Sequence, residues 1–351
     1  MASQAIKLLE RLISTPSVSR DESGTADIIE SYLSDCGFAA NRLYNNVWVQ
    51  SSEFTPERPT LLLNSHHDTV KPSPAYTNDP FVPVRSGGKI FGLGSNDAGA
   101  SVVSLIETFR LLDREPIGVN LLLAITAEEE VSGEKGVRAL LPHLKELGIG
   151  IDMALVGEPT GMQPAIAERG LVVLDCVAYG VTGHAARNEG VNALYKAVDD
   201  IEILRNLKFD KTSTVLGDMK ISVTQINAGR QHNVVPERCD FVVDVRTTDA
   251  YTNEQVVDMI RRAVTSDVTP RSTRIRASVI DESHPLVVAA KALGGIPYVS
   301  PTMSDMALMP DIPSLKMGPG ESSRSHTADE YVYEHEIVEA IEIYKKLIMA
   351  L

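Results

Sequence analysis

The feature that most constrains this sequence is a group of three consecutive glutamates, Glu128, Glu129 and Glu130, at the end of an apolar run. Residues 119–125 are predicted to form a buried strand, and Ser132-Gly133 beyond the glutamates is typical of a turn. Like charges this close repel one another, so the end of a buried strand is a costly place for them unless a cation lies there. Three acidic residues in a row are also common in solvated loops. If the rest of the chain supplies further ligands, the glutamates belong to a cation site; otherwise they belong to a solvated loop.

The order of the predicted elements indicates an α/β protein. Apolar residues at helical spacing predict helices, and short apolar or alternating runs predict strands between them. Alternation of this kind favours a substantially parallel sheet. The helices are predicted at 3–14, 24–36, 97–112, 134–147 and 334–349, and the strands at 47–50, 60–64, 119–125 and 153–156.

The pattern changes near residue 166. The order of strands and helices becomes β-α-β-β-α-β, which is that of a ferredoxin-like unit. We therefore expect an α/β domain at 1–165 and 281–351, interrupted by an inserted domain at 166–280. The inserted strands are predicted at 171–179, 220–227, 238–245 and 273–280, with helices at 191–207 and 253–264.

Four further segments carry metal-type ligands at the end of a predicted strand, or in a turn or loop that could follow one. His66 and Asp68 follow the strand 60–64, and residues two apart in extended chain point the same way. Asp97 lies in a glycine-rich turn, Glu158 follows the strand 153–156, and His326 follows a Gly-Pro-Gly loop. Each segment has an ordinary alternative: a polar turn, a helix N-cap, a Glu before Pro, or an acidic helix start.

Taken together, the five places predict a metal centre. The carboxyl ends of parallel strands lie along one edge of a sheet, where ligands bind. His, Asp and Glu make a nitrogen and oxygen donor set suited to Zn²⁺, Co²⁺ or Mn²⁺. Two such ions a few ångströms apart are well served by one bridging carboxylate. Nucleotide binding is disfavoured because the glycine-rich turn at 92–99 matches neither phosphate-binding motif.

Composition excludes several other classes of protein. The chain has 351 residues, which suggests about two domains, and its 33 basic and 47 acidic residues give a net charge of −14. This charge disfavours nucleic acids and anionic membranes as general partners. Cys36, Cys176 and Cys239 lack the spacing of a disulfide framework or a zinc motif. We found neither a signal peptide nor a membrane span, and we expect a cytoplasmic protein.

Nine short motifs, in order, resemble the di-zinc metallopeptidase family that contains acetylornithine deacetylase, succinyl-diaminopimelate desuccinylase, aminoacylase and carboxypeptidase G2. The resemblance covers nearly the whole chain and implies a zinc-peptidase-like catalytic domain with an inserted lid and dimerisation domain. The motifs are His-x-Asp-Thr-Val, Asn-Asp-Pro-Phe, Gly-Leu-Gly-x-x-Asp, the acidic triplet, Gly-Glu-Pro-Thr, Gly-His, Asn-Val-Val-Pro, Asp-Val-Arg, and Gly-Pro-Gly with His-Thr-Ala-Asp-Glu.

The resemblance implies a role for each residue of the metal centre, which would hold two Zn²⁺, with Co²⁺ or Mn²⁺ as substitutes. It makes Glu129 the general base that activates water for attack on an amide carbonyl. Two departures from the family pattern fall nearby, at Asn64-Ser65 and at residues 98–100. The implied ligands are His66 and Glu158 for one metal, Glu130 and His326 for the other, and Asp97 as the bridge, with Asp68 orienting His66.

The resemblance also implies substrate-binding residues. His184 in the inserted domain would stabilise the oxyanion, often across a dimer, while Asn233 and Arg246 would bind the substrate's carboxylate. Arg169 and Gly320 match further substrate positions. In addition, Arg324 lies two residues before His326, and we expect that it could meet the second carboxylate of a succinyl group.

The implied activity is hydrolysis of an Nα-acyl amino acid by a homodimer. The motifs most resemble acetylornithine deacetylase, which would place the chain in arginine biosynthesis, or an allied deacylase of acetylcitrulline, acetyl-lysine or succinylornithine. Succinyl-diaminopimelate desuccinylase is the runner-up, followed by a dipeptidase or aminoacylase. The other class, a metal-free binding protein that keeps the fold, would be indicated by loss of a ligand or of the base. All five ligands, Asp68 and Glu129 are present.

Overall fold

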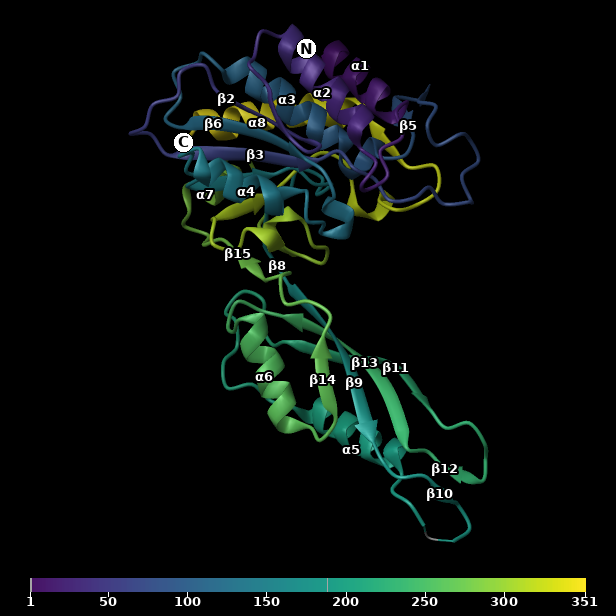
Figure 1. The fold of residues 1–351 in the computed structure, drawn as a ribbon. Helices are drawn as coiled ribbons and strands as arrows, with labels where there is room; N and C mark the ends of the chain where they lie inside the picture. The colour runs from purple at the N-terminus through teal and green to yellow at the C-terminus, as the bar shows by residue number, and fades with distance from the viewer. Residues whose placement is uncertain (1, 188) are drawn as a thin grey trace. The chain divides into compact units, whose positions relative to one another are not determined.

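The computed structural model describes residues 2–187 and 189–351, which fold into two units (Figure 1). The larger unit comprises Met1–Ile166, Ile280–Ser300 and Ser304–Leu351, and the smaller unit comprises Ala167–Val279 with Pro301–Met303. The boundaries expected from the sequence lie one residue from the main division at each side. Among the described residues, no helix is long and apolar enough to cross a membrane.

The larger unit is built on a mixed sheet whose centre is parallel. Its strands lie in the order β1-β2-β6-β3-β7-β17-β8-β15, with β16 also pairing with β8. Strand β3 runs parallel to both β6 and β7, and β7 runs parallel to β17. All residues of β3, β6 and β7 are buried, as expected of strands covered on both faces. The strands are β1 (Asn41–Leu43), β2 (Asn46–Gln50), β3 (Thr60–His66), β6 (Asn120–Thr126), β7 (Met153–Val156), β8 (Ala165–Glu168), β15 (Ser278–Val279), β16 (Tyr298–Ser300) and β17 (Ser314–Lys316).

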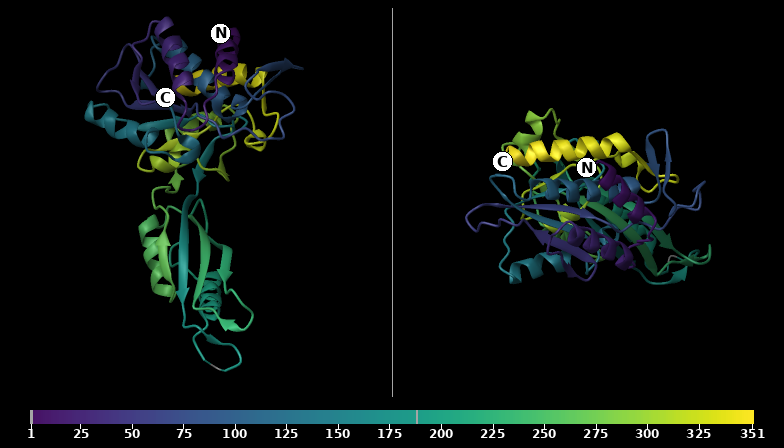
Figure 2. Two further views of the ribbon diagram at one scale, coloured as in Figure 1. Left: turned by 45° about the vertical axis from the view of Figure 1, so that its right-hand side comes forward. Right: turned by 90° about the horizontal axis from the view of Figure 1, so that it is seen from above.

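Helices cover both faces of this sheet (Figure 1). On one face, α3 packs against β3, β6, α1 and α8, and the views of Figure 2 show α1 and α8 on this same side. On the other face, Leu140 and Leu144 of α4 share an apolar cluster with Leu62 and Leu122. The helices are α1 (Ala2–Ile13), α2 (Ser23–Asp35), α3 (Ala100–Leu112), α4 (Val137–Glu146), α7 (Pro285–Ala292) and α8 (Glu334–Met349).

A second, three-stranded sheet was not predicted from the sequence. It pairs β4 (Val84–Ser86) with β5 (Lys89–Phe91), and β5 with β18 (Tyr331–Tyr333). Strand β18 joins this sheet from about 240 residues further along the chain, which local sequence patterns do not reveal. The pairing brings the segment that begins at Gly92 beside Glu330, whose carbonyl accepts the Gly92 N–H.

The smaller unit has a four-stranded antiparallel sheet in the order β11-β13-β9-β14. The predicted strand at 273–280 is wrong as a member of this sheet, and only Ser278–Val279 within it form a strand. The fourth strand is β14 (Asp267–Pro270), and Ser278 and Val279 pair instead with Glu168 and Ala167 of β8. The other elements are β9 (Gly170–Tyr179), β10 (Gly183–His184), α5 (Ala193–Asn206), β11 (Lys220–Ala228), β12 (Val234–Val235), β13 (Arg238–Thr247) and α6 (Asn253–Ala263).

Candidate metal centre

His66, the last residue of β3, lies at the centre of the predicted ligands. It is buried, and its Nε2 lies 3.2 Å from Asp97 Oδ1 and 3.7 Å from Glu158 Oε1. Its Nδ1 lies 3.0 Å from the main-chain carbonyl of Asp68, and because a carbonyl only accepts, Nδ1 donates that hydrogen bond. When the ring is neutral, the lone pair of Nε2 is therefore directed toward the two carboxylates, as metal-binding histidines require.

Asp97 is presented by a turn that Glu330 holds in place. The structure begins α3 at Ala100, so the predicted helix start at residue 97 is three residues too early. The Glu330 carboxylate accepts the main-chain N–H groups of Asn96 and Asp97, at 2.8 and 2.9 Å, and of Gly94 at 3.1 Å. This buried clamp fixes the backbone that carries Asp97.

Glu130 and His326 form the second group of predicted ligands. The Nε2 atom of His326 lies 3.1 Å from the Glu130 carboxylate and 3.6 Å from Asp97 Oδ2. Asp97 therefore faces His66 with one oxygen and His326 with the other. This is the arrangement expected of a carboxylate that bridges two ions.

The five side chains fit a pair of divalent cations. Each half offers one imidazole nitrogen with two carboxylates, counting Asp97 in both, which is a donor set suited to zinc. Ligand atoms of His66, Asp97 and Glu130 all lie within 4.8 Å of one another. Burial and the nearby charge of Asp97 raise the pKa of Glu158 to about 8, although His66 opposes them. Such crowding of carboxylates indicates a site that a cation completes.

Glu129 lies beside this group and has a different environment. Its pKa is raised well above the usual range by burial, which the charge of His66 opposes and that of Glu158 reinforces. Its main-chain N–H donates to Asp68 Oδ1 at 3.0 Å. A partly buried carboxyl with a raised pKa at the edge of a ligand cluster has the properties of a general base.

Comparison with known proteins agrees with this geometry. A profile of Peptidase family M20/M25/M40 matches residues 62–350. The chain belongs to this family. It is therefore a metal-dependent hydrolase with the mixed α/β fold that its motifs imply.

Two relatives in sequence carry the name succinyl-diaminopimelate desuccinylase. The protein of Paracoccus denitrificans is 30% identical over 275 residues, covering 73% of this chain and 70% of its own. That of Sulfurovum sp. is 29% identical over 261 residues, covering 72% and 70%. Both names match the runner-up activity predicted from the sequence, rather than acetylornithine deacetylase.

Two solved structures show the same fold. The aminopeptidase PepT from Bacillus cereus superposes with a TM-score of 0.79 at 18% identity, covering 100% of this chain and 98% of its own. The Bacillus subtilis protein YXEP, described as a dinuclear metal binding peptidase, superposes with a TM-score of 0.75 at 17% identity, covering 99% and 97%.

The predicted substrate residues of this M20 family chain are distributed over both units. His184, Asn233, Arg246 and Arg169 belong to the smaller unit, and Gly320 and Arg324 belong to the larger. Arg169 donates to the main-chain carbonyls of Leu216 and Asp218 in its own unit. Arg246 pairs with Asp244 on β13, through hydrogen bonds of 2.8 and 3.1 Å.

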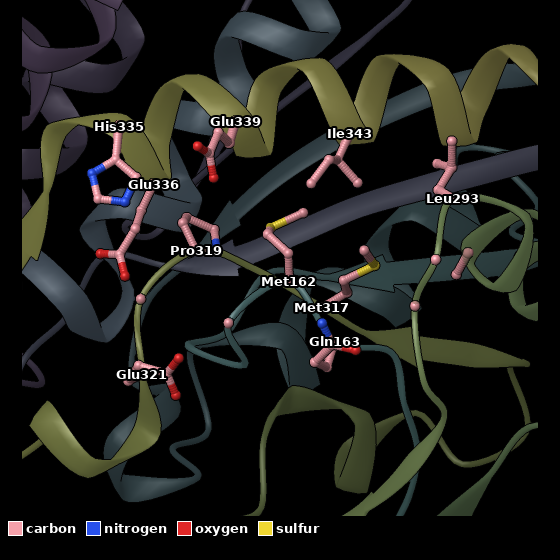
Figure 3. Close-up of a pocket in the computed structure, with 15 residues that line it drawn as sticks. Met162, Gln163, Leu293, Met317, Pro319, Glu321, His335, Glu336, Glu339 and Ile343 are labelled. Atoms are coloured by element: carbon pink, nitrogen blue, oxygen red, sulfur yellow. The ribbon is translucent and has the colours of Figure 1, made fainter.

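Arg324 has a partner within the larger unit. Its guanidinium makes a two-pronged ion pair with Glu336 at 2.8 and 3.1 Å and lies 4.8 Å from the centre of the Tyr331 ring. Glu336 also lines a pocket of about 280 Å³ under α8, where Met162 and Met317 face Ile343 (Figure 3). Arg324 could bind a succinyl carboxylate only by leaving its ion pair with Glu336. The sequence did not reveal this ion pair.

Residues that sequence reasoning missed include Glu330 and Ser19. Glu330 belongs to the His-Thr-Ala-Asp-Glu motif, but only the fold shows that it clamps the Asp97 turn. Ser19 donates from Oγ to Asp68 Oδ2 at 2.7 Å. No local signal marks Ser19, because its partner is 49 residues away.

Proposed function

We propose that this chain is a two-zinc amidohydrolase that removes the acyl group from an Nα-acyl amino acid. The observation that carries the proposal is that Glu129 and Glu130, although adjacent in the chain, have different surroundings. Glu130 faces His326 as a proposed ligand. Glu129 lies partly buried beside the ligands, and among the described residues its carboxyl has no direct hydrogen-bond partner. Hydrolysis by activated water needs such a separate base.

The sequence relatives support a succinyl group as the acyl group. Both are named succinyl-diaminopimelate desuccinylase, and we therefore propose N-succinyl-diaminopimelate as the first substrate to test. Acetylornithine is the second candidate, because the motifs around His66, Asn78 and Gly92 resemble that branch of the family. The two differ in a free carboxylate on the acyl group.

Residues of the larger unit are proposed to bind the metal ions and to transfer the proton. Zn²⁺ ions, when bound by His66, Asp97, Glu130, Glu158 and His326, supply Lewis acidity that acidifies water and polarises an amide carbonyl. Glu129 takes the proton of the attacking water and passes it to the leaving nitrogen. Asp68 holds the main chain of Glu129 and fixes the tautomer of His66.

The smaller unit supplies the proposed oxyanion donor. The main-chain N–H of Ala186 donates to His184 Nδ1 at 3.2 Å, so Nδ1 is an acceptor and Nε2 carries the proton in the neutral ring. An Nε2–H group is the donor that a developing oxyanion requires. His184 lies on β10, which pairs with β12 beside Asn233. Asn233 and Arg246 are proposed to bind the substrate's carboxylate, whereas His184 is proposed to stabilise the oxyanion.

A panel of substrates tests the proposal. Purified protein is analysed for zinc and cobalt, then assayed with N-succinyl-diaminopimelate, N-succinylornithine, acetylornithine, acetylcitrulline and acetyl-lysine. We expect one or two equivalents of metal, chelator-sensitive hydrolysis, and the highest kcat/KM on a succinyl substrate. Higher kcat/KM on acetylornithine would restore the alternative. Protein that binds no metal and hydrolyses none of these amides would contradict the proposed function.

We also propose that the enzyme is a cytoplasmic homodimer. The resemblance of the smaller unit to a dimerisation domain supports this assembly. Light scattering on purified protein is expected to give about twice the 38.1 kDa of one chain. A monomer with full activity would exclude a catalytic role for a partner's residues.

A further inference from the structure

Asp305 is a buried carboxylate that the mechanism above does not use. Its exposed fraction is 2%, and it begins the short helix η3 (Asp305–Leu308) in the larger unit. In residues 2–187 and 189–351, its Oδ1 atom has no hydrogen bond of good geometry, although the Asn64 side chain is close enough to lower the pKa of Asp305. Burying a carboxylate costs several kcal/mol unless a cation or enough donors compensate it. The burial of the Asp305 carboxylate therefore calls for an explanation.

A chain of hydrogen bonds connects Asp305 to the strands that carry the site. Thr126, the last residue of β6, donates from Oγ1 to Asp305 Oδ2 at 2.7 Å. Asn64 of β3 donates from Nδ2 to Thr126 Oγ1 at 3.0 Å. His66 lies two residues beyond Asn64, and Glu129 lies three residues beyond Thr126. Through these hydrogen bonds, Asp305 is connected to the ends of β3 and β6. These strands lead to the proposed ligand His66 and the proposed base Glu129.

The electrostatic surroundings of Asp305 also point toward the metal centre. Burial raises the pKa of Asp305 to about 6, and the Thr126 hydrogen bond and the charge of His66 oppose this rise. The charge of Asp305 in turn contributes to the raised pKa of Glu129. The positive charge that stabilises an ionised Asp305 therefore comes from the side of the ligands.

We propose that Asp305 is a positioning residue of the metal centre. Through Thr126 it holds the carboxyl ends of β3 and β6, and its negative charge behind the ligands strengthens the binding of divalent cations. The inference rests on the metal centre of the proposed function. It adds a residue outside the ligand set, whose effect on metal binding is separable from catalysis.

The substitution Asp305→Asn distinguishes this role from a purely structural one. Asparagine keeps the size of the side chain and an oxygen that accepts from Thr126, but it carries no charge. In metal-free protein the melting temperature is expected to stay the same or to rise, because a buried charge is removed. Zinc affinity is expected to fall by about 10–100-fold, as for other residues that support metal ligands. A structural role predicts the reverse: lower metal-free stability and unchanged affinity.

Two further variants complete the design. Thr126→Val removes the connecting hydroxyl without touching any charge, and it is expected to weaken zinc binding by a smaller factor. Asp200→Asn is the matched control, because Asp200 is a buried carboxylate of the smaller unit that accepts the N–H groups of Thr265 and Ser266, at 2.9 and 2.8 Å. We expect the control to lower the melting temperature and to leave zinc affinity unchanged.

The experiment measures zinc affinity by competition with a chromophoric chelator and thermal unfolding with and without zinc, for all four proteins. Weaker zinc binding in Asp305→Asn with undiminished metal-free stability supports the proposal. Wild-type affinity in Asp305→Asn, or a variant that does not fold, overturns it while leaving the proposed function intact. Equal losses of affinity in Asp305→Asn and Asp200→Asn also overturn it. A wild-type protein that binds no zinc overturns both proposals.

Discussion

The main-chain N–H of Glu129 donates to the carboxylate of Asp68 at 3.0 Å, and the N–H of Glu130 donates to the other oxygen at 3.2 Å. Asp68 is buried, and Ser19 completes its shell of donors. The carbonyl of the same residue fixes the tautomer of His66. Asp68 thus orients the proposed ligand His66 through its main-chain carbonyl and the acidic triplet through its side chain, whose Oδ1 also lies 3.5 Å from His66 Nδ1. The latter role was not expected, because the sequence suggested only a carboxylate facing the imidazole.

This relationship predicts the behaviour of Asp68→Asn. The amide oxygen accepts one of the two N–H groups, but the amide nitrogen then faces the other donor. We expect zinc affinity to fall by about 10–100-fold, because outer residues of metal sites contribute on this scale. Turnover at saturating zinc is expected to fall as well, since Glu129 loses its anchor. Chelator competition combined with kcat at several zinc concentrations separates the two effects.

For Glu129→Gln we expect retained metal and lost turnover. Glutamine keeps the shape of the side chain but cannot accept a proton from water, and general acid–base catalysis contributes typically about 10²–10⁴-fold. Metal analysis and single-turnover assays of the same preparation check this. Glu128→Gln is the control, because Glu128 accepts the N–H of Lys135 rather than facing the ligands. Full activity in a metallated Glu129→Gln protein would exclude Glu129 as the base.

Much of the larger unit could be predicted because its signals are local. The strands β3 and β6 read as contiguous apolar runs; β3 ends at His66, whose imidazole suits a metal, and β6 leads into the acidic triplet. The principle that parallel strands end at one edge then brings His66 and Glu130 together. The pattern of apolar residues and the donor chemistry were sufficient for this part of the site.

The remainder depends on contacts that sequence patterns do not encode. The segment 273–280 has strand-like composition, yet the carbonyls of Thr273 and Ile275 accept from the Asn253 side chain, and Ser278 pairs with Glu168. Asp305 lies 179 residues from its partner Thr126. In these cases tertiary packing decides which residues pair with one another, and it overrides local secondary-structure propensity.

The ion pair between Arg324 and Glu336 predicts a structural outcome for Arg324→Ala. Both side chains are about 15% exposed, and removal of one leaves the other unpaired. We expect destabilisation somewhat below the about 3–5 kcal/mol typical of breaking fully buried pairs. A double-mutant cycle with Glu336→Gln is expected to show coupling between the two residues.

The same variants decide between structural support and substrate binding. Because Glu336 occupies the guanidinium, we expect the ratio of kcat/KM for succinyl- and acetyl-ornithine to be unchanged in Arg324→Ala. The assay is run well below the melting temperature of the variant. A selective loss on the succinyl substrate would instead show that Arg324 reaches the acyl carboxylate.

Glu330→Gln is expected to loosen the turn that carries Asp97. One glutamine oxygen replaces two carboxylate oxygens that accept three N–H groups, so at least one buried N–H loses its acceptor. Such a loss costs about 1–3 kcal/mol. Thermal unfolding of metal-free protein and zinc titration should both report the change. Asp329→Asn is the matched control, because the neighbouring Asp329 is partly exposed and accepts from Thr77 instead.

Metal binding is expected to release protons at neutral pH. Without metal, the pKa of Glu158 is raised to about 8 by burial, and that of His326 is raised to about 9 by its hydrogen bond to Glu130. Both groups are therefore mostly protonated at pH 7, and both must lose a proton to become ligands. Burial lowers the pKa of His66, but the hydrogen bonds to Asp68 and Asp97 outweigh burial and raise this pKa well above its usual range, so His66 must lose a proton as well. We expect roughly three protons to be released when both sites fill at pH 7. The release should fall, and the apparent affinity should rise, as the pH passes through 8 and 9.

Calorimetric zinc titrations in buffers of different ionisation enthalpy measure the number of protons directly. A release that does not change between pH 7 and pH 10 would show that Glu158 and His326 do not titrate on metal binding.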